Sequence, residues 1–299
     1  MSRLCEGRVA IVTGAGRGIG REHALMLAAH GAKIVVNDLG ASADGVGADA
    51  TPAAQVVAEI KAAGGEAVAN GDDVSSWDGA KRMIDQAVES FGKLDVLINN
   101  AGILRDRMLV NMSEAEWDAV IQVHLKGTFA PARHAAAYWR GLQKETGRPV
   151  GARIINTTSV SGIYGNQGQS NYGAAKAGIA AFTIITAREL KRFGITCNAI
   201  SPSAQTRMTE GLRELTEAQR AQRNPRWVAP IATWLASEQS GHVTGRVFQA
   251  GNGILAVCEG WHRGPTVDLV EDPTQLGPVV DDIVSRARLN AGMNGLDLD

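Results

Sequence analysis

The sequence predicts an α/β fold: a doubly wound parallel sheet with helices on both faces. Between residues 8 and 249, short runs of β-branched and other apolar residues alternate with longer Ala-rich stretches. None of the short runs alternates strictly with polar residues, which is typical of strands buried on both faces of a parallel sheet. Repeated strand–helix units place the helices on the two faces. No repeat or linker interrupts the pattern, so we expect one domain over residues 7–251 and an extension over 252–299.

The predicted strands and helices alternate along the chain. The strands are expected at residues 9–12, 33–37, 66–69, 96–98, 153–156, 196–200 and 245–248. The helices are expected at residues 19–30, 52–63, 76–91, 114–140, 172–193 and 227–236. Pro52 and Ser113 stand at helix starts, and Ser113 with Glu116 matches a capping box. Four helices are followed by a glycine, which adopts a left-handed conformation at little cost: Gly31, Gly64, Gly92 and Gly194.

Two stretches fall outside this alternation. Residues 39–51 are expected to form a long loop rich in Gly, Ala and Asp. The tail after residue 252 contains a segment, 279–289, that could form one more helix.

Charge and hydropathy exclude two classes of protein. The chain has 30 Lys and Arg against 31 Asp and Glu, a formal net charge of −1, whereas a protein that mainly binds nucleic acid normally carries a basic excess. No apolar run approaches the roughly 18 residues that a membrane-spanning helix needs. We therefore expect neither a nucleic-acid partner nor a membrane-spanning segment.

The termini and the cysteines predict a cytoplasmic protein without a metal site. The N-terminus lacks the apolar region of a signal peptide, and the C-terminus carries no peroxisomal or retention tag. Cys5, Cys197 and Cys258 are odd in number and far apart in the sequence, which favours reduced thiols. The histidines show no metal-ligand spacing.

A glycine-rich turn joins the first predicted strand to the first predicted helix. The segment Thr13-Gly-Ala-Gly-Arg-Gly-Ile-Gly20 permits a tight turn and lets backbone N–H groups approach a pyrophosphate at the positive end of the helix. Such a turn also occurs without a ligand, but its place between strand and helix, with an acidic residue after the next strand, favours a dinucleotide. The residues expected to bind the cofactor here are Gly14, Arg17, Gly18, Ile19 and Gly20.

Asp38, at the end of the second predicted strand, bears on the choice between NAD and NADP. Its carboxylate can accept hydrogen bonds from both hydroxyls of the adenosine ribose and would repel a 2′-phosphate. Arg17 favours the opposite choice, because a guanidinium in this loop could contact that phosphate. Like charges in desolvated contact cost more than an exposed arginine that can swing away. We therefore predict NAD as the cofactor.

Tyr172 and Lys176 are the candidate acid–base pair, because they lie four residues apart on one face of one predicted helix. Such a pair is also common on protein surfaces. An isolated tyrosine titrates near pH 10, and a nearby Lys⁺ with a positive nicotinamide ring would lower that pKa toward the working range. Ser159, thirteen residues before Tyr172, follows the fifth predicted strand and is placed to hydrogen-bond the substrate oxygen.

These residues resemble the short-chain dehydrogenase/reductase family over residues 7–251. The motifs that carry the resemblance are the glycine turn at 13–20, Asp73-Val74, residues 99–102, Ser159, and the Tyr172/Lys176 pair. The resemblance implies a single Rossmann-like domain in which Tyr172 is the acid–base, Ser159 polarises the substrate oxygen and Lys176 holds the ribose. It also implies further cofactor contacts: Asp73 and Val74 at the adenine, Asn100, Ala101 and Gly102 on the ribose side, and Pro202 and Thr206 at the nicotinamide.

Two positions depart from the family pattern. His124, in Val123-His-Leu-Lys-Gly127, stands where the family has a catalytic asparagine. That asparagine is thought to shape the helix so that its backbone carbonyl holds a water of the proton relay, a role that a histidine can fill. His124 is therefore a candidate catalytic residue, either in direct proton transfer or as a packed histidine that supports the site. The usual Pro-Gly after the sixth strand is Pro202-Ser203 here, which implies a slightly different nicotinamide loop.

Several segments resemble one branch of the family, the (3R)-hydroxyacyl-CoA dehydrogenase units of peroxisomal multifunctional enzymes type 2, also called 17β-hydroxysteroid dehydrogenases type 4. These segments are residues 37–40, 102–107, 123–127, 161–166 and 199–204. The resemblance implies NAD-dependent oxidation of a secondary alcohol, a (3R)-3-hydroxyacyl-CoA or a 17β-hydroxysteroid. It also implies a homodimer or homotetramer, because the long helices at 114–140 and 172–193 commonly form the interface in this family.

Other functions stay open at this point. A 3-oxoacyl-(acyl-carrier-protein) reductase of the same family shares part of the pattern but usually pairs with NADPH and keeps the asparagine that His124 replaces. A sugar or small-alcohol dehydrogenase is a further alternative. A protein that senses NAD without catalysis would have the same fold, but it would not need the set formed by Ser159, Tyr172 and Lys176.

Overall fold

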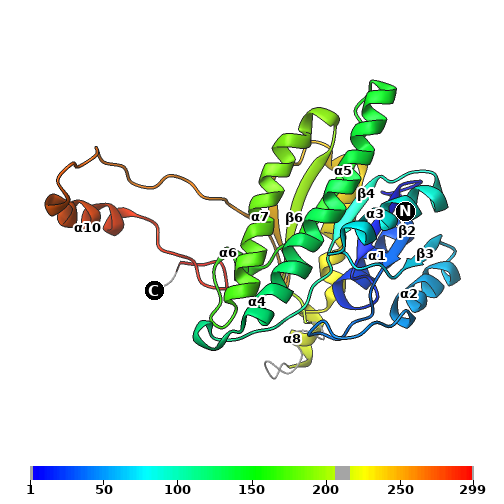
Figure 1. Cartoon of the computed structure of the whole chain (residues 1–299), viewed down its shortest axis with the longest axis horizontal. Helices are drawn as coiled ribbons and strands as arrows, with labels where there is room; N and C mark the ends of the chain where they lie inside the picture. Colours follow the sequence, from blue (N-terminus) through cyan, green and yellow to red (C-terminus); the bar gives the residue numbers. More distant parts are fainter. Residues whose placement is uncertain (1–2, 206–215, 298–299) are drawn as a thin grey trace.

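A computed structural model of the chain describes residues 3–205 and 216–297. The described strands form one eight-stranded sheet with the order β3-β2-β1-β4-β5-β6-β7-β8 (Figure 1). These strands are β1 (Val9–Thr13), β2 (Lys33–Asn37), β3 (Ala67–Asn70), β4 (Val96–Asn99), β5 (Arg153–Thr157), β6 (Thr196–Pro202), β7 (Val247–Gly251) and β8 (Ile254–Cys258). The first seven strands are parallel to one another, and all seven predicted strands are confirmed.

The eighth strand corrects the expectation of a wholly parallel sheet. β8 pairs antiparallel with β7 at the edge of the sheet. The two strands are joined by Asn252 and Gly253, both with positive φ (53° and 76°), as the two-residue turn of a tight hairpin requires. The sheet therefore takes in the first residues of the segment that the sequence predicts to be an extension.

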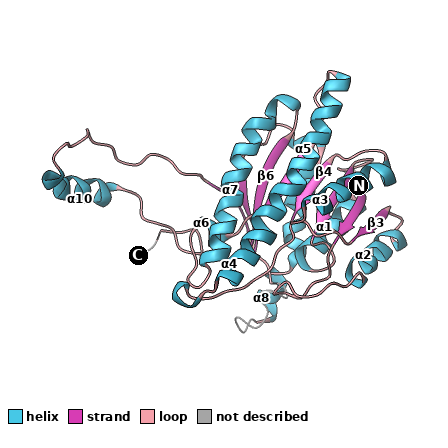
Figure 2. Ribbon diagram, viewed as in Figure 1, coloured by secondary structure: helices cyan, strands magenta, loops and turns pink. Residues whose placement is uncertain are grey.

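Helices cover both faces of the sheet (Figure 2). The described α-helices are α1 (Gly18–Ala29), α2 (Thr51–Ala62), α3 (Trp77–Phe91), α4 (Glu114–Ile121), α5 (Gly127–Thr146), α6 (Val160–Ile163), α7 (Ser170–Leu190), α8 (Glu217–Gln222), α9 (Ala229–Ala236) and α10 (Leu276–Arg286). One core joins α1, α2 and α9 to the sheet and includes Leu27 and Leu235. A second core, with Met83 and Trp139, joins α3, α5 and α7 to the other face. This is the predicted doubly wound arrangement.

The predicted helix ends are confirmed in their details. The Ser113 hydroxyl accepts from the backbone N–H of Glu116, and the Glu116 side chain accepts from the N–H of Ser113 in return. Each glycine predicted to follow a helix has a positive φ, between 76° and 91°. The single helix expected over residues 114–140 is instead α4 and α5 joined by a π-helical turn, Gln122–Lys126. This turn contains His124.

The chain after β8 leaves the body of the molecule, and α10 lies apart from the sheet and its helices (Figure 1). The helix has no buried residue, and Leu276, Val280 and Val284 expose an apolar stripe along it. The chain then returns, so that Gly295 packs against the ring and hydroxyl of Tyr164 beside α6. None of the described helices combines the length and the apolar composition needed to cross a membrane.

Candidate active site

The residues expected to carry function lie at one edge of the sheet, where the carboxyl ends of the parallel strands meet. The glycine turn follows β1, Asp38 follows β2, Asn100 follows β4 and Ser159 follows β5. Pro202 ends β6 at the same edge. In open parallel α/β sheets this edge is where ligands bind. Thr206 lies outside the described residues.

The glycine turn is packed so closely that side chains would not fit. A Cβ on Gly20 would meet the carbonyl oxygen of Gly14 and lie 2.5 Å from the side-chain nitrogen of Asn100. A Cβ on Gly14 would lie 2.8 Å from the Cα of Ala101. The turn leads into α1, whose first turn carries no acidic residue and whose N-cap, Arg17, makes no side-chain capping bond. Because no side chains stand in the way, the backbone N–H groups of the turn can approach a pyrophosphate at the positive end of the helix.

Asn100 fixes the glycine turn against β4. Its side-chain amide donates to the carbonyl oxygens of Thr13 (3.0 Å) and Gly14 (3.2 Å). The Thr13 hydroxyl accepts from the backbone N–H groups of Asn100 (2.9 Å) and Ala101 (3.1 Å). Asn100 therefore shapes the cofactor edge through the backbone of the turn.

Asp38 is held against the glycine turn by two backbone groups. One carboxylate oxygen accepts from the N–H of Gly16 and the other from the N–H of Gly40, each at 2.7 Å. A Cβ on Gly16 would lie 2.8 Å from Asp38 Oδ2 and 2.7 Å from the Cβ of Pro52. Gly16 was not among the residues predicted to bind the cofactor, although it is a glycine within the motif and only a glycine permits this approach.

The remaining residues implied for the adenine and ribose sides lie in tight turns. Asp73 follows β3 and accepts hydrogen bonds from the backbone and hydroxyl of Ser75, both at 2.8 Å. Val74 is buried, and a Cβ on Gly127 would lie 2.8 Å from its side chain. Ile19, in the first turn of α1, packs at the margin of the core on that face.

Ser159, Tyr172 and Lys176 form one cluster, as the motif predicts. Ser159 caps the short helix α6 by accepting from the N–H of Ser161 at 3.2 Å. The Ser159 side chain lies near enough to the Tyr172 hydroxyl to lower the pKa of the phenol. Lys176 lies one turn further along α7, with its ammonium 5.5 Å from the centre of the Tyr172 ring. That ammonium donates to the carbonyl oxygen of Thr157 at 2.6 Å.

Burial moves both titratable groups of this cluster away from their charged forms. Removal from water raises the pKa of Tyr172 to about 12, against the lowering effect of the Ser159 side chain. Burial also lowers the pKa of Lys176 to about 7. The nearby charge of Asp106 raises the pKa of Tyr172 further. The lowering expected from Lys176 together with a bound nicotinamide stays a prediction, because it includes the charge of the cofactor. A phenolate here needs further positive charge.

His124 is buried beside Tyr172. The two rings meet edge to face, with their centres 5.1 Å apart. His124 Nε2 lies 2.7 Å from the carbonyl oxygen and 3.1 Å from the backbone nitrogen of Ile103, and a Cβ on Gly102 would collide with the imidazole. Burial lowers the pKa of His124 to about 3, so the imidazole is neutral at physiological pH. These contacts favour its interpretation as a packed residue that positions Tyr172 and the segment after β4.

Asn171, which was not among the predicted site residues, is a buried residue that holds Tyr172 in position. Its fully buried side-chain amide donates to the carbonyl oxygens of Arg105 (2.9 Å) and Glu116 (3.2 Å). Its side-chain oxygen accepts from the N–H of Tyr172 at 2.7 Å. Asn171 thus ties the start of α7 to the segments before and within α4. The sequence shows only an asparagine directly before Tyr172, and its burial appears only in the structure.

Within residues 3–205 and 216–297, no group of three or more His, Cys, Asp or Glu side chains is arranged to hold a metal ion.

Comparison with known proteins places this arrangement in a family. The model of the short chain dehydrogenase family matches residues 8–219. The hydroxyacyl-CoA dehydrogenase ChsB1 of Mycobacterium tuberculosis is 44% identical over 276 residues, which cover 89% of this chain and 80% of ChsB1. Peroxisomal multifunctional enzyme type 2 of Mus musculus is 44% identical over 260 residues, or 86% of this chain and 33% of that protein. The chain thus spans about a third of the length of such multifunctional relatives.

A solved structure agrees with both the fold and the sequence match. A short chain dehydrogenase from Mycobacterium avium superposes with a TM-score of 0.86 at 52% sequence identity, covering 96% of this chain and 98% of that one. Because the family model covers most of the chain and the structural match extends over nearly all of it, this chain belongs to the short-chain dehydrogenase family.

Proposed function

We propose that the chain oxidises the C3 hydroxyl of a (3R)-3-hydroxyacyl-CoA to the 3-oxo thioester, with NAD as the electron acceptor. The observation that carries the proposal is the grouping of Ser159, Tyr172 and Lys176 at the edge that also holds the glycine turn, with the Lys176 ammonium 5.5 Å from the centre of the Tyr172 ring. The substrate class is supported by the names of the relatives, which include a hydroxyacyl-CoA dehydrogenase.

Each residue of the cluster has a separate task in this reaction. Tyr172 takes the proton of the substrate hydroxyl, and Ser159 hydrogen-bonds the same oxygen and orients it. Lys176, held by Thr157, supplies positive charge beside the phenol and passes the proton toward solvent. His124 and Asn171 hold Tyr172 in place. When bound, the nicotinamide accepts the hydride that leaves the carbinol carbon and adds positive charge near Tyr172.

The preference for NAD over NADP is supported by Asp38. Backbone N–H groups hold its two oxygens at the end of β2, where the family resemblance expects the adenosine ribose. Each oxygen keeps a lone pair for a ribose hydroxyl, whereas a 2′-phosphate would meet the negative charge. Comparable rates with NADP and NAD at equal concentration would contradict this part of the proposal.

The experiment that tests the substrate follows NADH absorbance with the purified chain, NAD and one alcohol at a time. The alcohols are a (3R)-3-hydroxyacyl-CoA, its (3S) enantiomer and a 17β-hydroxysteroid. We expect fast turnover of the (3R) thioester and slow turnover of the other two. Faster oxidation of the steroid would make the chain a hydroxysteroid dehydrogenase. NADPH-dependent reduction of acyl-carrier-protein thioesters alone would make it a reductase, and NAD binding without any turnover would favour a sensor.

We also propose that the chain forms a homodimer or homotetramer through α5 and α7. Phe129 on α5 and Ile185 on α7 are exposed (42% and 54%), although both are large and apolar. Phe129 lies 6.0 Å from Trp77 on α3 and 6.3 Å from Phe182 on α7, ring centre to ring centre. This apolar band extends over three helices, as a protein–protein contact would.

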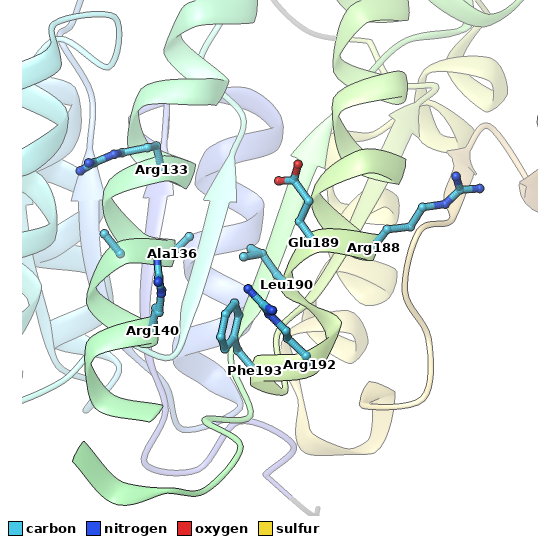
Figure 3. A pocket seen from close by; sticks show the side chains of 9 residues that line it. Arg133, Ala136, Arg140, Arg188, Glu189, Leu190, Arg192 and Phe193 are labelled. Atoms are coloured by element: carbon cyan, nitrogen blue, oxygen red, sulfur yellow. The ribbon is translucent and has the colours of Figure 1, made fainter. Parts of the chain in front are cut away.

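The part of the α5–α7 face that carries many charges is less suited to contact with a second copy of the chain. A cleft of about 600 Å³ lies between the middle of α5 and the C-terminal end of α7 with the 3-10 turn that follows it (Figure 3). Arg133, Arg140, Arg188 and Arg192 line it with a single acidic residue, Glu189. Glu189 is seventeen residues from Tyr172 along α7, about 25 Å at the helical rise per residue, so the cleft is separate from the catalytic cluster.

A cytoplasmic location is also part of the proposal. It is supported by the state of the three cysteines, which are unpaired; Cys5 and Cys197 are buried in the cores. Since peroxisomal proteins are among the relatives, the test is fractionation of cells that express the chain, with a peroxisomal or exported pool as the contradicting outcome.

A further inference from the structure

The loop between β2 and α2 folds back on itself beside Asp38. The backbone N–H of Asp49 donates to the carbonyl oxygen of Leu39 at 2.9 Å. Gly40 has a φ of +74°, and a Cβ there would collide with the carbonyl of Asp49. The N–H of Gly40 in turn donates to Asp38. The loop therefore places a second aspartate directly beside the residue expected to bind the adenosine ribose.

Arg17 follows Gly16 in the glycine turn and is the N-cap residue of α1. Gly16, the residue before it, touches both Asp38 and Pro52. Asp49 is three residues before Pro52 in the chain, and its Oδ1 accepts from the N–H of Thr51 at 2.8 Å. Arg17 and Asp49 thus flank the same contact between the glycine turn and the start of α2.

The charges of the two residues interact. Hydrogen bonds from Thr51 lower the pKa of Asp49 below its ordinary value, and the positive charge of Arg17 lowers it further. Asp49 is therefore ionised at physiological pH, and both side chains are exposed at the rim of the cofactor edge. An arginine in this turn favours NADP, so the charges near it matter for the choice of nucleotide.

We propose that Asp49 is a second determinant of nucleotide choice, which attracts the Arg17 guanidinium toward the loop and so withholds it from a 2′-phosphate. The inference rests on the proposed preference for NAD and deepens it. Asp38 repels the 2′-phosphate directly, whereas Asp49 acts through Arg17. Neither Asp49 nor Arg17 is expected to affect NAD binding in this way, because the 2′-hydroxyl of NAD carries no charge.

The test compares two aspartates of the same loop. Asp44 is exposed like Asp49 and is likewise hydrogen-bonded to a hydroxyl two residues away, but the cation near it is Arg105. Asp49→Asn and Asp44→Asn each remove one negative charge and keep a side-chain oxygen for the local hydrogen bond. The dissociation constants of NADH and NADPH are measured by fluorescence titration of the purified full chain, without substrate.

We expect Asp49→Asn to tighten NADPH binding by up to about fivefold, the upper end of what two exposed opposite charges contribute. NADH binding stays within about twofold, and Asp44→Asn changes neither affinity. Adding Arg17→Ala to Asp49→Asn abolishes the gain. The proposal is overturned if Asp49→Asn leaves NADPH affinity unchanged, if Asp44→Asn gives the same gain, or if the gain persists without Arg17.

This measurement separates the inference from the proposed function. A wild-type chain that binds NADPH more tightly than NADH would contradict the NAD preference. The role of Asp49 depends instead on the change between variants, and neither result depends on which alcohol is the substrate.

Discussion

Tyr172 and Lys176 are neighbours in a site that opposes charge on both. Burial raises the phenol pKa to about 12 and lowers the ammonium pKa to about 7. With these values the isolated chain carries a neutral phenol at physiological pH and a lysine that is only partly protonated. Proton abstraction by Tyr172 therefore depends on positive charge brought to the cluster. This links acid–base chemistry to cofactor binding, because the oxidised nicotinamide carries such a charge.

Removal of the Tyr172 hydroxyl tests this assignment. Tyr172→Phe should lower kcat by about 10³, the usual contribution of a positioned acid–base group. The dissociation constant of NADH should stay within about twofold, because the ring and its contact with His124 remain. Tyr138→Phe is the matched control, since Tyr138 lies on α5 and packs at the margin of the core. Near-normal turnover by Tyr172→Phe would contradict the assignment.

Two buried histidines predict how stability depends on pH. Burial lowers the pKa of His23 to about 4 and that of His124 to about 3, against an ordinary value of 6.5. The unfolded chain therefore binds protons that the folded chain excludes. The stabilisation is complete above pH 6.5 and is lost as pH falls toward the folded pKa values, by up to about 1.4 kcal/mol per pH unit for each histidine.

The measurement is the urea midpoint of unfolding at pH 7, 6 and 5. His23→Gln should make the midpoint depend less steeply on pH. His262→Gln, a change at an exposed residue of the tail, should leave the dependence unchanged. A wild-type midpoint that does not move between pH 7 and pH 5 would show that the two imidazoles are accessible to protons in the folded chain.

At the scale of elements, the glycine turn and α1 act as one unit. Gly20 lies in α1, yet its Cα faces the carbonyl of Gly14 and the amide of Asn100, so the helix start, the turn and β4 share one packing contact. A side chain at position 20 would collide with the backbone carbonyl of Gly14, so the backbone itself would have to shift to make room. The shape of the pyrophosphate edge and the packing of the first strand–helix unit therefore depend on the same residue.

Two helical glycines make a matched pair for testing this. Gly20→Ala should cost about 1–3 kcal/mol of unfolding free energy, as overpacking does, and should weaken NADH binding. Gly141→Ala, in α5, meets nothing within 4 Å, and alanine favours a helix by about 0.5–1 kcal/mol over glycine. Thermal unfolding and NADH titration of both variants check the pair. Equal effects of the two substitutions would contradict the packing argument.

The elements that could be predicted are those whose sequence pattern can be explained by a single structural requirement. Buried parallel strands need continuous apolar runs, and all seven were identified by them. The break between α4 and α5 was missed, because a π-helical turn changes the backbone hydrogen bonds while the apolar pattern continues through it. β8 was missed because its side chains are exposed at the sheet edge. The dipeptide Asn252-Gly253, a strong hairpin signal, could have revealed it.

The candidate site divides in the same way. Residues with a chemical task, such as Tyr172 and Lys176, belong to recognisable motifs and were found. Gly16 and Asn171 have no chemical task and act through packing and backbone contacts with segments distant in the sequence. Contacts of this kind follow from the folded arrangement and leave little trace in one sequence.

At the scale of the whole molecule, the parallel strands bring the cofactor turn and the catalytic cluster to one edge, while α5 and α7 extend along one face (Figure 1). Tyr172 lies at the start of α7, so a contact between copies along this helix would reach from the apolar band toward the catalytic cluster. Assembly through this face would therefore hold the helix that positions the acid–base residue.

A charge in the apolar band tests the assembly. Phe129→Glu and Ile185→Glu should each reduce the mass measured by light scattering to that of one chain, because a contact between copies would bury the new carboxylate without a partner. Val46→Glu is the control, since Val46 is as exposed (60%) but lies in the loop after β2. Dissociation by Val46→Glu as well, or an unchanged mass in all three variants, would move the contact away from α5 and α7. Loss of turnover on dissociation, with NADH binding retained, would show that the contact supports the catalytic cluster rather than the cofactor turn.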